Sequence, residues 1–261
     1  IPQAALDYLA NPSQFNDYDW YDQLHNPALT QSYDLSASTS TDMGSFRIST
    51  GYKKQDGVAL GTGYERANIR LNSDFNLSER LKVGQSFSGA KSKTKLEPFA
   101  YARSVLWNSI SLPPYFPFEE PYTSYWGGPN FNETNVVRWN DFFTRNQTTD
   151  NLNANIYAQF EVIKGLKFRI NGAFSSTQIH VKERARYLPE FAPGRSISEN
   201  TVTSSNWNID NLLTYNNTFG KHSVDLLAGF VAQEFIDKGL SASKSQFISS
   251  TTSTIDAPGG K

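Results

Sequence analysis

Cysteine is absent from the 261-residue chain, and long apolar runs are scarce. The lack of cysteine excludes a disulfide framework and any metal site held by thiolates. The longest uninterrupted apolar run is Leu226–Ala232, whereas a membrane-spanning helix needs about 20 apolar residues. The sequence therefore predicts no helix that crosses a membrane.

An excess of charge of either sign is also missing. The formal net charge is -1, so the total does not indicate nucleic acid or an anionic surface as a partner. The chain opens on Ile1-Pro2-Gln3 without a charged start or an apolar stretch, and this predicts no signal peptide within it. Both ends are expected to be cuts through something larger.

Aromatic residues, in contrast, are abundant. They make up 14% of the chain, although the mean hydropathy is only -0.51. A water-soluble domain uses its aromatic residues mostly to fill a core. The combination is instead typical of a wall that has one apolar face and one wet face.

Apolar and polar residues alternate over many windows, which indicates strands with one buried face. The clearest window is Asn155–Val162, and the next one follows directly after Lys164-Gly165, which predicts a hairpin with a tight turn. Several windows exceed ten residues and match the 9–11 residues that a tilted strand needs to cross a bilayer. About eight strands are expected, near 31–40, 45–54, 65–75, 81–88, 155–162, 166–174, 202–217 and 223–232.

The predicted connections alternate between short and long, as in outer-membrane barrels, which have short periplasmic turns and long external loops. The short ones lie near 41–44, 76–80, 163–165 and 218–221, and the long ones near 55–63, 93–147 and 184–200. The sequence thus predicts an all-β fold, an antiparallel transmembrane β-barrel segment that forms part of a single barrel domain over residues 1–261. Residues 93–147 are expected to form a long external loop, with a short helix near 98–111.

Two groups of residues are candidates for contact with a ligand. Polar positions on the strands would line a hydrated lumen; they are Arg66, Arg70, Glu161, Lys167 and Arg169. The long loop is rich in aromatic residues, which either pack on one another or a partner or form a surface on which a sugar ring stacks. These aromatic candidates are Trp107, Tyr115, Phe116, Tyr122, Tyr125 and Trp126.

No motif for bond-making chemistry stands out. The three histidines, His25, His180 and His222, lie far apart and have no metal-ligand spacing. A nucleophile elbow, a zinc-protease helix and a phosphate-binding loop are all missing from the sequence. We therefore expect no catalytic residue, no metal, no cofactor and no enzymatic activity.

Two segments near the start of the chain, Asp19-Trp20-Tyr21-Asp22-Gln23-Leu24 and Gln31–Ser38, begin a series of short matches that follow one another in order. They resemble the barrel region of SusC/RagA-type TonB-dependent transporters, in which a Thr-Asp-Trp-x-Asp segment is followed by a strand with a pattern similar to Asn-Leu-Ser-Val-Ser-Gly. Further matches are Phe46–Gly57, Tyr64–Asn72 and Leu81-Lys82-Val83-Gly84. The similarity in order and spacing covers roughly residues 15–92.

The resemblance implies energy-coupled import of a glycan or an oligopeptide across the bacterial outer membrane. Members of the family have a 22-stranded barrel around a plug, so about eight strands would be a middle portion, without the plug domain and the C-terminal part of the barrel. The implied partners are a SusD-like surface lipoprotein that covers the barrel, TonB acting through the plug, outer-membrane lipid and the glycan or peptide ligand.

Two other interpretations of the strand pattern stay open at this point. Eight strands are just enough to close a small barrel, which would act as an adhesin or a structural outer-membrane protein. A soluble β-sandwich that binds carbohydrate is the other alternative, although it does not explain the sorting of the loops by length.

Overall fold

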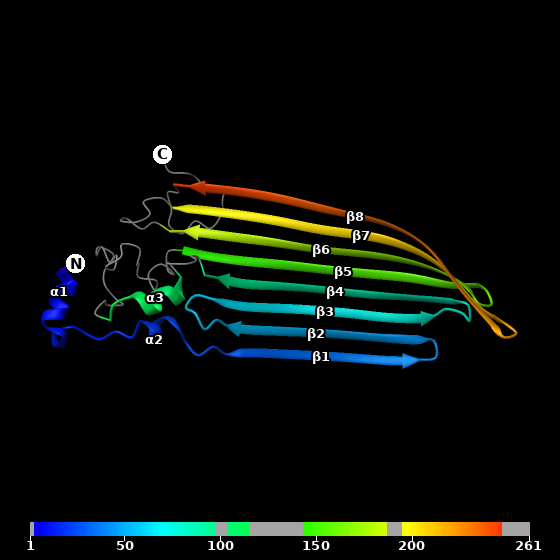
Figure 1. Ribbon diagram of the computed structural model, residues 1–261, viewed down its shortest axis with the longest axis horizontal. Coiled ribbons are helices and arrows are strands. Elements are labelled where there is room, and N and C mark those ends of the chain that lie inside the picture. The colour runs from blue at the N-terminus through cyan, green and yellow to red at the C-terminus, as the bar shows by residue number, and fades with distance from the viewer. Residues whose placement is uncertain (1–2, 98–103, 115–142, 187–194, 247–261) are drawn as a thin grey trace.

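The computed structural model describes residues 3–97, 104–114, 143–186 and 195–246. Eight strands in these ranges form one antiparallel sheet in chain order (Figure 1). The predicted all-β fold is confirmed. Because the described strands form a single open sheet in which β1 and β8 do not pair, the stacked sandwich and the small closed barrel are both wrong. The strands are β1 (Thr30–Thr41), β2 (Gly44–Asp56), β3 (Gly63–Asn76), β4 (Leu81–Leu96), β5 (Phe143–Ile163), β6 (Leu166–Ala185), β7 (Ser196–Phe219) and β8 (His222–Ser245).

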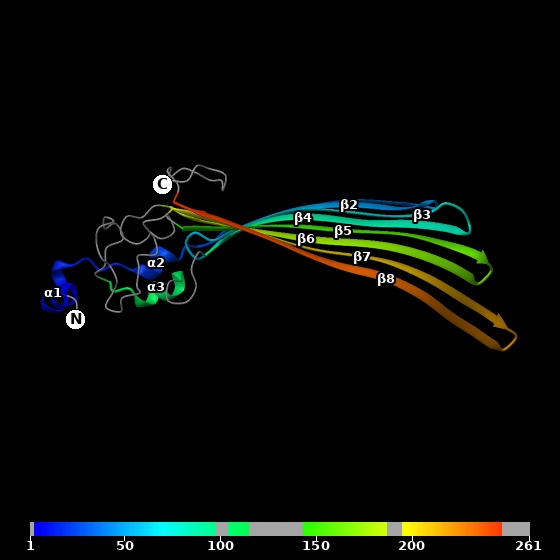
Figure 2. The same ribbon diagram turned by 90° about the horizontal axis from the view of Figure 1, so that it is seen from above.

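The connections sort by length onto the two ends of the sheet, as predicted. The hairpins β1–β2, β3–β4, β5–β6 and β7–β8 turn within a few residues at one end, which we call the short-turn end (Figure 1). The turn at Lys164-Gly165 has only two residues, and Gly165 there has a φ of 85° that glycine adopts without strain. The helices lie at the opposite end, which we call the helix end. Seen from above, the sheet is strongly twisted and curved (Figure 2).

Strict alternation gives the sheet two different faces. The apolar face carries, for example, Ile69 of β3, its partner Gly89 of β4 and Leu152 of β5. The polar face carries the residues between them, such as Asn68 and Asn153. No second layer of described residues covers the apolar face, and Ile156 on it is 66% exposed in the isolated chain.

Most strands extend further towards the helix end than the alternation predicts. Strand β4 continues to Leu96 and strand β5 begins at Phe143, so the ends of the predicted loop 93–147 are strand. Strands β6 and β8 likewise continue to Ala185 and Ser245. In these extensions most residues of both faces are polar, so the regular alternation is lost while the backbone pairing continues.

Short helices occupy the helix end: α1 (Gln3–Ala10), α2 (Trp20–Leu24) and α3 (Val105–Ser111), together with a 3₁₀ turn at Pro12–Gln14. None of the helices among the described residues is long and apolar enough to cross a membrane. The helix predicted near 98–111 is confirmed over Val105–Ser111. Ser104 caps its first turn, because the Ser104 side chain accepts a hydrogen bond from the Trp107 N–H. Residues 98–103 lie outside the described residues.

A small buried cluster joins α2 and α3 to the connection between β2 and β3. Trp20 and Leu24 of α2 pack with Val105 and Leu112, and the partly buried Ala59 and Leu60 of the β2–β3 connection pack against them. The Trp20 indole N–H donates to the Pro113 carbonyl oxygen at 3.2 Å. The long connection after β4 is therefore anchored to the segment that precedes β1.

Candidate functional site

The polar face is crossed by hydrogen bonds between side chains of neighbouring strands. On β5 to β7, the Asn155 amide donates to the Asn171 carbonyl oxygen at 2.8 Å, and the Asn171 amide donates to the Asp210 carboxylate at 3.2 Å. On β3 and β4, the Ser86 hydroxyl donates to Asn72 at 2.7 Å. Short amide, hydroxyl and carboxylate side chains that hydrogen-bond to one another across strands give a hydrophilic face that is suited to contact with water.

An aromatic contact with the same character lies nearer the short-turn end. The Tyr157 hydroxyl donates to the Asp74 carboxylate at 2.6 Å, and the Arg169 guanidinium lies 4.0 Å from the centre of the Tyr157 ring. The ring passes over Gly84 of the intervening strand β4 so closely that a Cβ atom there would lie 2.7 Å from Tyr157 Cζ. The missing side chain of Gly84 thus makes the contact between β3 and β5 possible.

Two arginines of β3 border a hollow in the polar face. The hollow has a volume of about 570 Å³ and is bordered by Arg66, Arg70, Tyr64, Asn151 and Asn153, together with serines of β2 and β4. Arg66 and Arg70 are both exposed. Neither has a hydrogen-bond or ion-pair partner within the part of the chain that the structure describes, and no carboxylate lies among the described residues that line the hollow.

The other three predicted polar positions lie on the same face, but not in the hollow. Glu161 pairs in register with Lys167, and Arg169 pairs with Gln159. Glu161 accepts a hydrogen bond from the Gly165 backbone N–H at 3.2 Å, and Arg169 is placed over Tyr157. These contacts give Glu161 and Arg169 structural roles near the short turns, at a distance from Arg66 and Arg70 along the strands.

Of the aromatic loop residues, the structure describes only Trp107. It lies on α3 and is 49% exposed. The other predicted members lie outside the described residues; they are Tyr115, Phe116, Tyr122, Tyr125 and Trp126. A stacking surface thus stays a prediction. Among the described residues, no group of three or more acidic or histidine side chains has a geometry that could hold a metal ion.

Comparisons with known proteins agree with the geometry of the sheet. No family model matches the chain. It is 27% identical to TonB-dependent receptor P3 of Formosa agariphila over 253 residues, which cover 93% of this chain and 25% of the relative. TonB-dependent receptor P26 of the same organism is 27% identical over 241 residues, 87% of this chain and 23% of the relative. The chain thus spans about a quarter of the length of the curated relatives it matches.

Solved structures show the same fold. The RagAB peptide transporter superposes with a TM-score of 0.80 at 23% identity, over 94% of this chain and 29% of the matched chain. A RagAB peptide importer in the closed-closed state gives a TM-score of 0.79. The resemblance to SusC/RagA-type TonB-dependent transporters is confirmed. In fold, the sheet matches a barrel segment of such a transporter, and the curated relatives bear the names of receptors rather than of enzymes.

Proposed function

We propose that this chain forms part of the barrel wall of a TonB-dependent importer, with its polar face lining the lumen through which a glycan or an oligopeptide passes. A SusD-like surface lipoprotein covers the barrel at the helix end, and the aromatic residues of the loop between β4 and β5 meet that lipoprotein or the ligand. TonB acts through a plug inside the barrel.

The observation that carries the proposal is the pair Arg66 and Arg70, which border the hollow of the polar face without a charged partner among the described residues. Guanidinium groups bind carboxylates with two parallel hydrogen bonds. Because serines and asparagines make up most of the rest of the lining, a ligand with both an anionic group and many hydroxyl or amide groups suits the hollow best. A peptide with a free carboxylate and a uronate-containing oligosaccharide both meet this description.

The test measures the uptake of fluorescent probes by cells that carry the full-length protein. The probes are an oligopeptide with a free carboxylate, its amidated form, a uronate-containing oligosaccharide and a neutral one. We expect uptake to require TonB, and we expect R66Q/R70Q to reduce uptake of one anionic probe about tenfold, since a hydrogen bond to a charged group contributes about 1.5–3 kcal/mol. The matched control K82Q removes a charge from the same face outside the hollow.

TonB-independent uptake of every probe would refute the import mechanism, and equal uptake by wild type and R66Q/R70Q would refute the role of the hollow. Purification of the full-length protein from native membranes tests the partner. A surface lipoprotein that co-purifies in a fixed ratio supports the proposal, whereas a barrel that always purifies alone contradicts it.

A further inference from the structure

Strand β8 is apolar on both faces over part of its length. The longest apolar run of the chain, Leu226–Ala232, lies within it. Ala228 pairs with Leu213 on the apolar face. The side chains that alternate with Ala228, including Leu227 and Val231, therefore lie on the polar face. A short continuous apolar run is typical of a strand that is buried on both sides. Because lipid covers only the outside of a barrel wall, the run predicts that protein covers the other side.

Three of these side chains form what we call the inner patch: Leu212 of β7 with Leu227 and Val231 of β8, all on the polar face. Leu227 and Val231 lie on either side of Gly229, and Leu212 leans over that glycine, since a Cβ atom there would lie 3.3 Å from Leu212 Cδ1. In the isolated wall, Leu227 is 72% and Val231 61% exposed. Phe235 adds another exposed apolar side chain on the same face of β8. The inner patch is thus an uncovered apolar surface.

Neighbouring strands carry small or polar residues at the corresponding places of the polar face. On β4 these residues are Gly84, Ser86 and Ser88. On β5 and β6 they include Asn155 and Asn171, whose side chains hydrogen-bond to each other at 2.8 Å. The inner patch is therefore a local feature of β7 and β8 rather than a general property of the wall.

Charge divides the polar face in the same way. Among the described residues, the polar face of β2 to β4 carries one acidic side chain, Asp74, and five basic ones, which are Arg47, Lys53, Arg66, Arg70 and Lys82. The polar face of β7 and β8, both described in full, carries no basic side chain and three acidic ones, which are Asp210, Asp225 and Asp237. An anionic ligand is therefore attracted to β2–β4 and repelled by β7 and β8.

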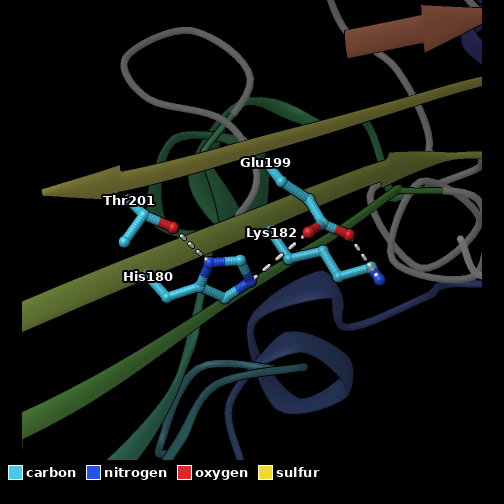
Figure 3. Close-up of polar contacts among 4 residues, drawn as sticks. All are labelled: His180, Lys182, Glu199 and Thr201. Carbon is cyan, nitrogen blue, oxygen red and sulfur yellow. Dashed lines mark hydrogen bonds and ion pairs between the residues drawn. The ribbon is translucent and has the colours of Figure 1, made fainter. Parts of the chain in front are cut away.

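On the opposite face of β6 and β7, a carboxylate is paired within the wall. Lys182 Nζ lies 2.7 Å from one carboxylate oxygen of Glu199, and His180 Nε2 lies 3.7 Å from the other (Figure 3). His180 Nδ1 is in turn 2.8 Å from the Thr201 hydroxyl oxygen. Glu199 therefore needs no cation from another surface.

The carboxylates around the inner patch are not paired in this way. Asp210 stands opposite Val231 in register, and Asp225 lies two residues before Leu227. Asp210 accepts a hydrogen bond from the Asn171 amide at 3.2 Å. No side chain in the described part of the chain forms an ion pair with Asp210, Asp225 or Asp237. A surface that covers the inner patch can therefore offer basic groups to these carboxylates.

We propose that the plug rests on the inner patch, and that the plug surface in contact with it is apolar and carries basic side chains at its edge. This inference rests on the proposed function, in which a plug lies inside the barrel. The plug fits the patch better than the ligand does, because the carboxylates of β7 and β8 repel the anionic groups that Arg66 and Arg70 attract. The ligand then passes on the side of β2 to β4, while the plug stays in contact with β7 and β8.

Cysteine labelling of the full-length protein tests the contact. Val231→Cys and Asn153→Cys are introduced one at a time into a background without other reactive cysteines, and a water-soluble maleimide is added to the purified, ligand-free barrel. Both positions are exposed in the isolated wall, so an empty lumen would give equal rates. We expect Val231→Cys to react about tenfold more slowly or less, because a covered side chain reacts only when the structure opens locally. Denatured samples, in which the two rates should be equal, control for intrinsic reactivity.

A second experiment measures whether the inner patch holds the plug in place. Cells without TonB carry the full-length variants, and the entry of vancomycin, a bulky antibiotic, is measured. We expect Val231→Asn to raise entry by at least about tenfold, because burial of one aliphatic side chain contributes about that factor to an equilibrium constant. The matched control is Val202→Asn, the same substitution on the same face but away from the inner patch, and it should exclude vancomycin like wild type.

A shift in electrophoretic mobility between heated and unheated samples verifies that each variant has a folded barrel. Equal labelling of the two cysteines, or a Val231→Asn barrel as tight as Val202→Asn, would overturn the proposal. Protection of Val231→Cys that appears only when a ligand is added would show that the ligand covers the patch, and would overturn it as well. Both readouts are independent of import, so TonB-dependent uptake with an unprotected Val231→Cys refutes only the contact, whereas TonB-independent uptake with a protected one refutes only the proposed function.

Discussion

Gly84 and Gly89 lie on the same strand but on opposite faces, and the structure predicts very different results for the same substitution. At Gly84, a Cβ atom would collide with the Tyr157 ring and with the Asp74 carboxylate. The Gly84→Ala variant must therefore displace the ring, which breaks the 2.6 Å hydrogen bond from Tyr157 to Asp74 and removes the ring from Arg169. At Gly89, a Cβ atom would meet its nearest neighbour at 3.8 Å, which is ordinary contact.

The expected loss at Gly84 is about 2 kcal/mol. A hydrogen bond to an ionised group contributes about 1.5–3 kcal/mol, and the lower end applies because the Tyr157–Asp74 bond is exposed. A cation–π contact at an exposed site adds about 0.5–1 kcal/mol. Replacing glycine by alanine within a strand also stabilises the protein by about 0.5–1 kcal/mol, because alanine loses less conformational entropy on folding. Gly89→Ala gains the same stabilisation, so the effect cancels when the two variants are compared.

The assay follows the unfolding rate of the full-length protein at elevated temperature, from the mobility difference between folded and unfolded barrel. If the lost contacts are absent from the transition state, Gly84→Ala unfolds up to about thirtyfold faster than Gly89→Ala. Tyr157→Phe, which keeps the ring and removes only the hydroxyl, should show an intermediate rate. Equal rates for the two alanine variants would refute the argument that the ring over Gly84 stabilises the sheet.

Two further experiments test the orientation of the sheet and the cap of α3. Ile156→Lys places a charge at the middle of the apolar face and should destabilise the barrel by about 2–4 kcal/mol, whereas Asn155→Lys on the polar face should cost only about 1 kcal/mol, the contribution of its hydrogen bond to Asn171; equal losses in the same unfolding assay would contradict the assignment of faces. Ser104→Ala removes the side chain that accepts from the Trp107 N–H and should destabilise α3 by about 1 kcal/mol. Hydrogen exchange of α3 should then be faster at its first turn, and an unchanged exchange rate there would show that the cap contributes little.

Much of the sheet is predictable from the sequence because a lipid-facing strand must alternate. Where Ile156, Ala158 and Phe160 face lipid and Tyr157 and Gln159 face water, period two is visible in the sequence itself. The tight turns are also predictable, because a position with a positive φ, such as that of Gly165, favours glycine. Strand order and loop sorting follow from these features, since antiparallel neighbours joined by short turns pair in chain order.

The features that the sequence did not predict are those in which alternation carries no information. Towards the helix end, most residues on both faces of β4 and β5 are polar, so the sequence predicts a loop over Lys93–Leu96 and Phe143–Gln147 although their backbones pair. Helix α2 has only five residues and no period to detect; its one local signal is Asp19, whose carboxylate accepts from the Asp22 N–H at 3.0 Å. The hollow at Arg66 and Arg70 was predictable only as polarity, because its shape depends on small residues of two neighbouring strands.

The mean hydropathy of the chain does not reveal that its strands form a barrel wall. A strand such as β5 passes through lipid and water at the same depth, so its two faces cancel in any window, and the mean of -0.51 carries no trace of the membrane. The end of the apolar stretch is visible instead as a change of pattern along one face, from Gly89 to Lys91 on β4 and from Leu152 to Asp150 on β5. Because the two changes lie in register, they define a level across the sheet, and a level shared by strands far apart in the sequence is what a bilayer surface requires.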